Sequence, residues 1–487
     1  MSTLSLRSLL ATVVLLTACM PTKRHGWPVQ AGPHGGDPHA SAPQPGLEPA
    51  FFAPVPVEQV LDNGLRVLVV SKRNLPLVHI RVLLRGGSAL DPPSVPGLAM
   101  FYGETLRAGT DEMGSEALAD AFESLGASLH VEVGTESIEL SATTLREHAD
   151  RLVELLGAVL LRPAFAVDEL ERVRKRLIIS LQQERDEPTA LADRLFWQTV
   201  YAEHPYGHAV SGSASALTKI TREDLLAYGG RVAQAKNATL VLVGDVDEPH
   251  ASQMARGAFG TWTPGEQVAD VALPTAAPAR IVIIDQPSAP QSQLRIGALG
   301  VARSSPDRDA LLLCNAVLGG QFNSRINMNL REDKGYTYGA FSRFAFMRRP
   351  GPFVVSTGVR TDASAPAIDE ILREGATMRE TSVTQEELNN ARNLYVLSLP
   401  SAFQTIAGMA SSVAQLSLYD LPLDYFRTLP ARLAAITTAD VLRVAAQHLS
   451  LEALSIVVVG DRTKIEKGLE QLRRGAPELV TPEQVGL

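Results

Sequence analysis

Two histidines, His204 and His208 in the stretch HPYGH, have a spacing that can hold a metal ion. Imidazole rings four residues apart bind Zn²⁺ together when both leave the same face of a helix. Pro205 and Gly207 favour a turn over a helix, so the two rings need not share a face. We therefore predict a loop at this stretch and no metal ligand.

Several other kinds of site are excluded by sequence motif and composition. The chain holds no Gly-x-Ser-x-Gly nucleophile elbow, no G-x-G-x-x-G dinucleotide loop and no P-loop. Its net charge of −8 argues against a nucleic-acid partner, because proteins that bind nucleic acid are normally basic. The two cysteines, Cys19 and Cys314, provide neither a disulfide framework nor a cysteine-based metal site. Cys314 follows an apolar run and is expected to be a buried thiol.

The first residues predict export and a membrane anchor. An arginine precedes the short apolar run Leu9–Leu16, and the segment ends in Leu-Thr-Ala-Cys at Cys19. This ending resembles a bacterial lipobox, which implies that residues 1–18 are a signal peptide and that Cys19 carries a lipid. Met20 follows in place of aspartate, which by analogy favours the outer membrane, facing the periplasm. Residues 19–56 are dense in Pro, Gly and Ala and predict a flexible tether.

The folded part begins with strands and continues with amphipathic helices. Asn63-Gly64 is a hairpin turn signal, and apolar strands are predicted on its far side and again over Leu77–Leu84. Leucines at helical spacing predict a helix from about Leu145 to Leu160, and a second one is predicted from Asp168 to about Glu187. Strands and helices do not alternate regularly, so we predict an α+β fold in which helices cover a mixed sheet.

The chain repeats itself at nearly one offset. Two blocks recur: four pairs lie 216 residues apart and two further pairs 218 apart, namely Ile220/Ile436, Asp224/Asp440, Gly244/Gly460, Asp245/Asp461, Leu170/Leu388 and Arg174/Arg392. Aligned blocks of this kind indicate a duplication. We therefore predict two domains of one fold, residues 57–262 and 281–475, joined by a proline-containing linker over 263–280 and followed by a tail, 476–487.

On these motifs the chain resembles the pitrilysin or insulinase family of zinc metallopeptidases, in its mitochondrial-processing-peptidase-like subgroup. The resemblance covers about residues 57–475 and rests on Asn63-Gly64-Leu65, Gly97-Leu98-Ala99, Gly109-Thr110, HPYGH, and GGQFNSRINMNLREDKGYTYG. Catalytic members carry His-x-x-Glu-His on the first-half helix, where two histidines hold zinc and the glutamate is the general base. A further glutamate, some seventy residues on, completes the ligand set.

This chain departs from the family at the zinc motif. In the register given by Gly97-Leu98-Ala99, Met100 replaces the first histidine, Gly103 replaces the base and Glu104 replaces the second histidine. Methionine is a poor zinc ligand and glycine cannot accept a proton. The third ligand would fall in Leu177–Leu181, which holds no carboxylate. The resemblance therefore implies that this chain holds no zinc, no other cofactor and no catalytic residue of its own.

The second half keeps the family's other half-site. Arg331 and Tyr338, seven residues apart, match the arginine and tyrosine with which the family grips the peptide backbone opposite the zinc. Some members of the family divide these functions between two subunits, one with His-x-x-Glu-His and one with the Arg/Tyr pair. The resemblance thus implies a non-catalytic subunit that binds peptide substrate and pairs with a homologous catalytic subunit carrying zinc.

Two other functions stay open at this point. The chain could be a non-enzymatic binding or assembly scaffold, as the core subunits of some respiratory complexes in this family are. It could also be an autonomous metallopeptidase with a rebuilt metal site, against which the lost base argues. Whether the chain is an enzyme in its own right is therefore left undecided by the sequence, and activity is expected only in a complex.

Overall fold

The structure is a computed structural model that describes residues 51–487. The predicted signal peptide, the lipidated Cys19 and residues 19–50 of the predicted tether lie outside the described residues. Within residues 51–487, no helix has the length and apolar character needed to cross a lipid bilayer.

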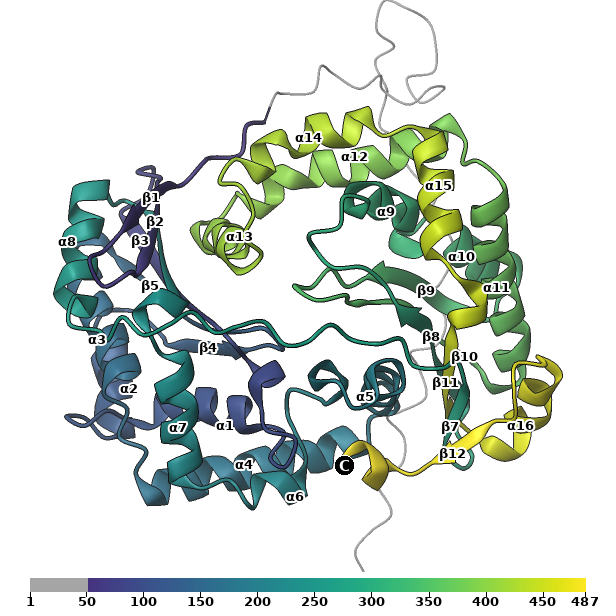
Figure 1. The fold of residues 1–487 in the computed structure, drawn as a ribbon, viewed down its shortest axis with the longest axis horizontal. Helices are drawn as coiled ribbons and strands as arrows, with labels where there is room; N and C mark the ends of the chain where they lie inside the picture. Colours follow the sequence, from purple (N-terminus) through teal and green to yellow (C-terminus); the bar gives the residue numbers. More distant parts are fainter. Residues whose placement is uncertain (1–50) are drawn as a thin grey trace, which may run out of the picture. The chain divides into compact units, whose positions relative to one another are not determined.

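Two six-stranded mixed sheets, one in each half of the chain, are covered by helices (Figure 1). The first half contains β1 Val57–Val60, β2 Arg66–Ser71, β3 Leu77–Arg85, β4 His130–Val133, β5 Ser137–Leu145 and β6 Ala238–Gly244, with α1 Leu98–Thr105, α2 Ser115–Glu123, α3 Ala149–Leu161, α4 Val167–Arg185, α5 Pro188–Tyr201, α6 Ala214–Leu217, α7 Arg222–Val232 and α8 Glu248–Phe259. The second contains β7 Ile281–Asp285, β8 Gln291–Leu299, β9 Thr337–Phe344, β10 Pro352–Arg360, β11 Ser455–Gly460 and β12 Glu478–Val480, with α9 Arg308–Asn315, α10 Arg325–Asn327, α11 Ser364–Glu380, α12 Gln385–Ala402, α13 Ile406–Leu418, α14 Tyr425–Ala435, α15 Thr438–His448 and α16 Arg462–Gln471. The predicted α+β class is confirmed.

The two sheets have the same topology over five strands. Their orders are β2-β6-β3-β5-β4 and β7-β11-β8-β10-β9, and in both the first pair is parallel and the rest antiparallel. The sixth strand differs, because β1 pairs antiparallel with β2 whereas β12 pairs parallel with β7. β6 and its equivalent β11 come late in their halves and yet lie inside their sheets, so each sheet closes only when most of its half is present.

The predicted duplication is visible in individual contacts. Arg174 on α4 donates to the carbonyls of Leu217 and Ile220, and Arg392 on α12 donates to the carbonyls of Leu433 and Ile436. Helices α7 and α15, which come next, are each preceded by a threonine that forms a reciprocal capping box with the aspartate three residues further on. An arginine at the equivalent position thus binds the chain just before the equivalent helix in both halves.

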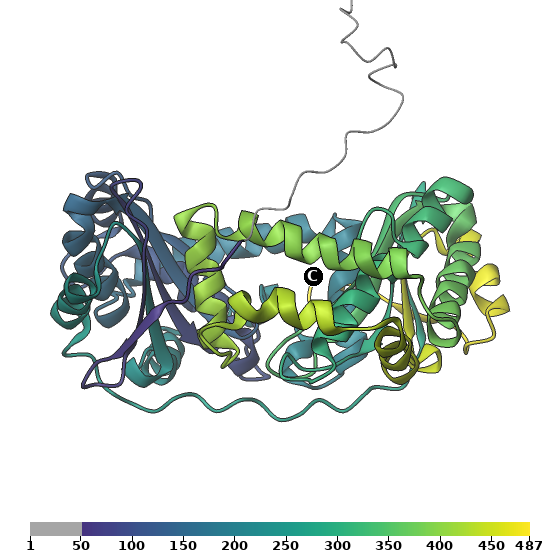
Figure 2. The same cartoon turned by 90° about the horizontal axis from the view of Figure 1, so that it is seen from above.

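Each sheet is covered on one face by a helix from the other half. α13 packs against β3 and β6 of the first sheet, and α5 packs against β8 and β11 of the second (Figure 1). The two helices begin at Pro188 and Ile406, 218 residues apart, so equivalent helices are exchanged. Figure 2 shows α12 and α14 side by side, with α13 at the end of the pair that reaches the first half.

The exchange gives the two halves a shared core. Leu195 and Phe196 of α5 are buried in one cluster with Val282 and Val457 of the second sheet. Beside this cluster the buried Arg295 of β8 donates from Nε to Asp193 Oδ1 of α5 at 2.6 Å. Residues 52–487 accordingly form one compact unit, in which residues 263–280 lie along the chain between the strands of the two sheets.

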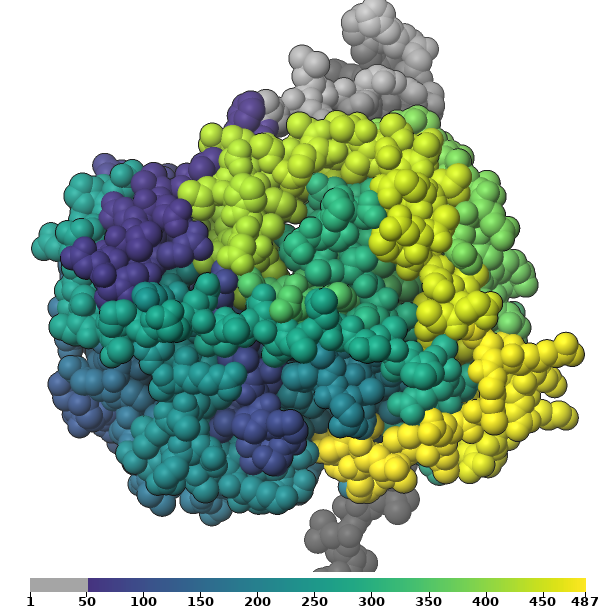
Figure 3. All heavy atoms as spheres, in the orientation of Figure 1, coloured from purple at the N-terminus to yellow at the C-terminus, as the bar shows by residue number. Residues whose placement is uncertain are grey.

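The segments expected to be linker and tail both take part in this unit. Residues 263–280 contain no helix or strand and cross the surface between the halves (Figure 3). Asp270 of this segment pairs with Arg348, which also binds Asp420 after α13. Residues 476–487 contribute β12 and the 3₁₀ turn η10 (Pro482–Val485), whose Val485 joins the shared core.

Candidate functional site

Helix α1, the family's zinc helix, starts from a fixed position. The side chain of Asp91 is fully buried and accepts hydrogen bonds from the backbone N–H groups of Gly97 at 2.7 Å and Ala99 at 2.8 Å. Burial raises the pKa of this carboxyl, and the nearby His208 and the hydrogen bonds from these N–H groups oppose the rise. Gly97 adopts the left-handed conformation, with φ of 98°, which glycine tolerates best. The register of Met100, Gly103 and Glu104 is therefore determined structurally.

The position of the family's general base is filled by a neighbouring strand. Gly103 is buried, and α1 packs against β4 at this point. A Cβ atom on Gly103 would lie 2.4 Å from Cγ2 of Val133 and 3.4 Å from Cγ1 of Val131. These distances leave no room for a glutamate side chain on the β4 side of the helix.

Glu104, at the position of the second histidine, binds arginines. Its carboxylate is 2.6 Å from Arg176 on α4 and also pairs with Arg107, one turn further along the chain. The carboxylate side chain is only 15% exposed, so these two guanidinium groups satisfy a largely buried charge. Arg176 comes from the helix that would supply the third zinc ligand.

The residues in this region do not fit a zinc ion. Met100 is half-buried, Gly103 has no donor atom, and the stretch Leu177–Leu181 on α4 supplies no carboxylate or imidazole. Among residues 51–487, no group of three or more His, Cys, Asp and Glu side chains is arranged to hold a metal. The Glu104–Arg176 ion pair joins α1 to α4, where a metal would join them in a catalytic relative.

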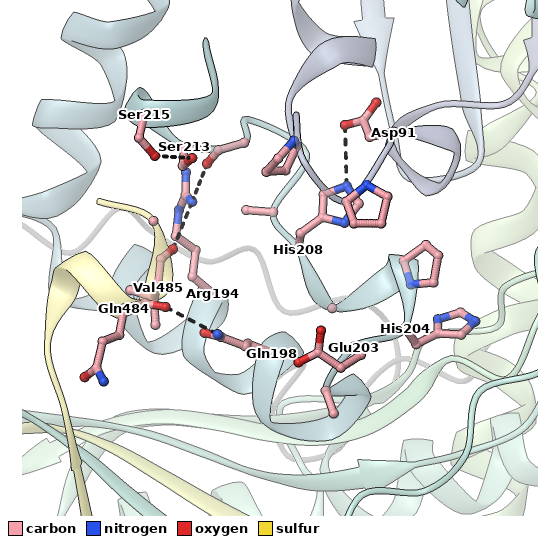
Figure 4. Close-up of a pocket in the computed structure, with 18 of the residues that line it drawn as sticks. Asp91, Arg194, Gln198, Glu203, His204, His208, Ser213, Ser215, Gln484 and Val485 are labelled. Carbon is pink, nitrogen blue, oxygen red and sulfur yellow. Dashed lines mark hydrogen bonds and ion pairs between the residues drawn. The ribbon is translucent and has the colours of Figure 1, made fainter. Parts of the chain in front are cut away.

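The HPYGH stretch forms a loop, as predicted, around the 3₁₀ turn η4 (Pro205–Gly207). His204 accepts from the N–H of Tyr206 at its Nδ1, and its Nε2 lies 2.9 Å from the carbonyl of Ala272, so both ring nitrogens are engaged. His208 instead lies 3.4 Å from Asp91, and Figure 4 shows the two rings apart. The pair is therefore not arranged as a metal site.

A cavity of about 360 Å³ lies beside this loop, between α5 and the C-terminal residues (Figure 4). Its one buried cation, Arg194, is bound by Glu184 at 2.9 Å, by Ser211 at 2.7 Å and by the carbonyl of Gly212 at 2.9 Å. Because these acceptors occupy the guanidinium, Arg194 offers no free positive charge to a ligand. We assign it a structural role in joining the C-terminal segment to α5.

Arg331 and Tyr338 lie on either side of a turn at the start of β9. The Arg331 side chain is 36% exposed; its Cζ lies 4.6 Å from the centroid of the Phe322 ring and its Nε lies 3.3 Å from Glu332. Tyr338 is 89% exposed. The turn between them is closed by the N–H of Tyr336, which donates to the carbonyl of Leu330 at 2.8 Å. Both side chains thus remain available to a ligand.

Two buried asparagines, which sequence reasoning did not single out, position β9. Asn327 accepts from the N–H of Ala340 at 3.0 Å, and Asn315 donates to the carbonyl of Ser342 at 3.0 Å. They bind the outer edge of the strand, because its other edge pairs with β10. An asparagine within an apolar helical run, as at Asn315 after Cys314, was the available signal for such a role.

Comparison with known families assigns a family to the region of α1 and to the region of Arg331 and Tyr338. The family model described as "Insulinase (Peptidase family M16)" matches residues 66–214, and that described as "Peptidase M16 inactive domain" matches residues 219–395. The chain belongs to peptidase family M16. The predicted family is thereby confirmed, with the altered zinc motif in the first matched region and Arg331 and Tyr338 in the second.

Relatives of this M16 chain match along most of their length. A protein named "Non-peptidase homolog YmxG" from Helicobacter pylori is 24% identical over 408 residues, covering 82% of this chain and 94% of its own. An "Uncharacterized zinc protease YmxG" from Bacillus subtilis is 20% identical, covering 68% of this chain and 80% of its own. The crystal structure of a peptidase M16 inactive domain from Pseudomonas fluorescens superimposes with a TM-score of 0.79 at 28% identity, covering 83% of this chain and 98% of its own. The chain is therefore an M16 peptidase-like protein along most of its length.

Proposed function

We propose that this chain is the non-catalytic, substrate-binding subunit of a heterodimeric zinc metallopeptidase that degrades peptides in the cell envelope. The partner is a homologous subunit that carries His-x-x-Glu-His and the zinc. This chain contributes Arg331 and Tyr338, which hold the peptide backbone opposite the partner's metal. A lipid on Cys19 anchors the complex to the outer membrane, facing the periplasm.

The contrast between the two half-sites carries the proposal. The place of the zinc site is taken by Val133 and by the Glu104–Arg176 ion pair, so the first half has no means of activating water. In the second half, Tyr338 is 89% exposed and the terminal nitrogens of Arg331 have no partner within the described residues. A guanidinium fork and a phenol are suited to bind peptide carbonyls and to orient a chain for hydrolysis by another subunit.

Coexpression tests this proposal. The mature chain, a homologous His-x-x-Glu-His subunit and the two together are purified, and zinc content and hydrolysis of a quenched fluorescent peptide are measured. We expect activity only from the pair, with zinc on the catalytic subunit. Arg331→Ala in the pair should lower kcat/KM by roughly 100-fold, the usual effect of removing one donor that acts in the transition state.

Tyr338→Phe removes only the phenol oxygen, and Tyr336→Phe, two residues away, is its matched control. The Tyr338 variant should lose activity and the Tyr336 variant should keep it. Full activity in both Arg331→Ala and Tyr338→Phe complexes would refute the substrate-binding role. Failure of the two subunits to copurify would refute the heterodimer.

A non-enzymatic scaffold is the second candidate function. The filled zinc position favours it, because a chain without metal chemistry can persist for binding alone. It predicts that peptide or partner binding depends on Arg331 while no combination of subunits hydrolyses peptide. The coexpression experiment therefore separates the two functions.

A further inference from the structure

Three arginines surround one tyrosine in the second half. The guanidinium carbons of Arg432, Arg303 and Arg308 lie 4.4, 5.5 and 5.8 Å from the centroid of the Tyr425 ring. They come from α14, from the loop after β8 and from the first residue of α9. Elements distant in sequence thus bring three positive charges to one aromatic side chain.

The cluster has too few anions to balance it. Asp309 pairs with Arg308 at 2.6 Å and with Arg432 at 2.9 Å. Arg303 has no ion pair and no side-chain hydrogen bond within residues 51–487, and its Nε is buried without a partner. The Tyr425 hydroxyl is likewise buried and unpartnered, in a residue that is 9% exposed.

An unpaired guanidinium in this setting is unusual, because buried charges are normally paired. Burial and the nearby charge of Arg308 lower the pKa of Arg303, so the protein environment disfavours its charge. Arg303 as a whole is half-buried, and its terminal nitrogens donate no hydrogen bond to residues 51–487. A fork of free N–H donors with adjacent positive charge is the chemistry that binds a carboxylate.

Strand β9 connects this cluster to the peptide-binding pair. The N–H of Arg303 donates to the carbonyl of Met347 at 2.7 Å, just beyond the end of β9, whereas Tyr338 lies at the beginning of that strand. The seven strand residues from Tyr338 to Phe344 span about 20 Å. The exposed side chain of Phe341 lies between the two ends.

We infer that Arg303 and Arg308 form a subsite for a carboxylate of the bound peptide, about seven extended residues from Tyr338. The inference rests on the proposed function and names its substrate class. Preferred peptides carry a free C-terminal carboxylate, or an aspartate or glutamate, at that distance from the segment held by Arg331 and Tyr338. Free small anions share this chemistry, and the experiment separates them from peptides.

The test measures anisotropy of fluorescein-labelled peptides on the full mature chain. Uncharged peptides of Ala, Ser and Phe, four and eight residues long, are compared as C-terminal acids and carboxamides. We expect the eight-residue acid to bind about tenfold more tightly than its amide, the scale of one charge-assisted hydrogen bond. Arg303→Gln should abolish this preference. The matched control is Arg360→Gln, which neutralises an exposed arginine at the end of β10.

Each outcome decides the inference. Equal binding of acid and amide, or a preference that survives Arg303→Gln, overturns it, and Arg303 then serves only as a stacking side chain. The thermal midpoint Tm is also compared in inorganic phosphate and in sodium chloride at equal ionic strength. If phosphate raises the Tm only when Arg303 is present, and acid and amide peptides still bind equally, the site binds free anions. The peptide assignment is then overturned. If acid and amide peptides bind equally and both lose affinity for the Arg331→Ala variant, the proposed function is supported and this subsite is refuted. Absence of any peptide binding refutes the proposed function itself.

Discussion

Gly103 provides a quantitative test of the conclusion that packing fills the position of the general base. An alanine there would place its Cβ 2.4 Å from Cγ2 of Val133. The valine is short and β-branched, so its methyl group cannot move away without displacing β4. Overpacking of this kind costs about 1–3 kcal/mol. Alanine also gains about 1 kcal/mol over glycine in a helix, so we expect Gly103→Ala to lower the free energy of unfolding by up to about 2 kcal/mol.

Gly257 in α8 is the matched control for this substitution. It is exposed, and a Cβ atom there would meet nothing within 4 Å. Gly257→Ala should therefore gain about 0.5–1 kcal/mol from helix propensity alone. Urea denaturation followed by circular dichroism, on the chain without residues 1–19, should shift the two midpoints in opposite directions with equal m values.

A second substitution identifies the neighbour responsible for the loss. Val133→Ala shortens the side chain that meets the new Cβ and should destabilise the chain when introduced alone. Introduced together with Gly103→Ala, it should cost less than the sum of the two, with a coupling of about 0.5–3 kcal/mol. If Gly103→Ala stabilises the chain as Gly257→Ala does, α1 is not held close to β4 and the position of the lost base is open.

Three further predictions follow from burial. Burial, with smaller contributions from the neighbouring charges, lowers the pKa of His79 from 6.5 to about 4; the unfolded chain therefore binds the proton first, and stability falls by about 3 kcal/mol as the pH drops from 6.5 to 4. His79→Gln should remove this slope from urea midpoints measured across that range. Cys314 is fully buried, and burial raises the pKa of its thiol to about 12. Ellman's reagent at pH 8 should therefore react with this thiol at least 100-fold faster in urea than in the native chain. Equal rates would contradict the burial. Residues 51–262 and 281–487 expressed separately should each lack a cooperative urea transition because each sheet needs the other half's helix, and a cooperative transition in either half would refute this.

The local elements and the duplication were predictable because their signals are local or repeated. The Asn63-Gly64 turn joins β1 and β2, the predicted helix from Asp168 is α4, and the lone thiol Cys314 is buried. Arg174 and Arg392, which lie at the offset of the repeat, predicted equivalent halves, and the structure gives the two arginines carbonyl partners at equivalent positions. Hydrophobic period and turn chemistry determine such features without reference to the rest of the chain.

The exchange of α5 and α13 was not predictable in this way. An apolar helix face indicates burial but does not specify which sheet covers it, so the pattern at Leu195 and Phe196 fits either half equally well. The same limit applies to the altered zinc region. Val133 and Arg176 are distant from Gly103 and Glu104 in sequence, and nothing in their types shows that they meet.

The two half-sites differ in whether selection for a stable fold alone can explain the residues found there. A largely buried carboxylate such as that of Glu104 needs a positive partner when no metal is bound. Arg176 is such a partner, and selection for a stable fold alone would be enough to retain this ion pair. Tyr338 has no comparable structural purpose, because a side chain that is 89% exposed contributes little packing. A fold maintained for stability alone therefore explains the first half-site but not the second. We propose that the exposed phenol and the unused donors of Arg331 serve a ligand that reaches them from outside the chain, and Tyr338→Phe tests this role directly.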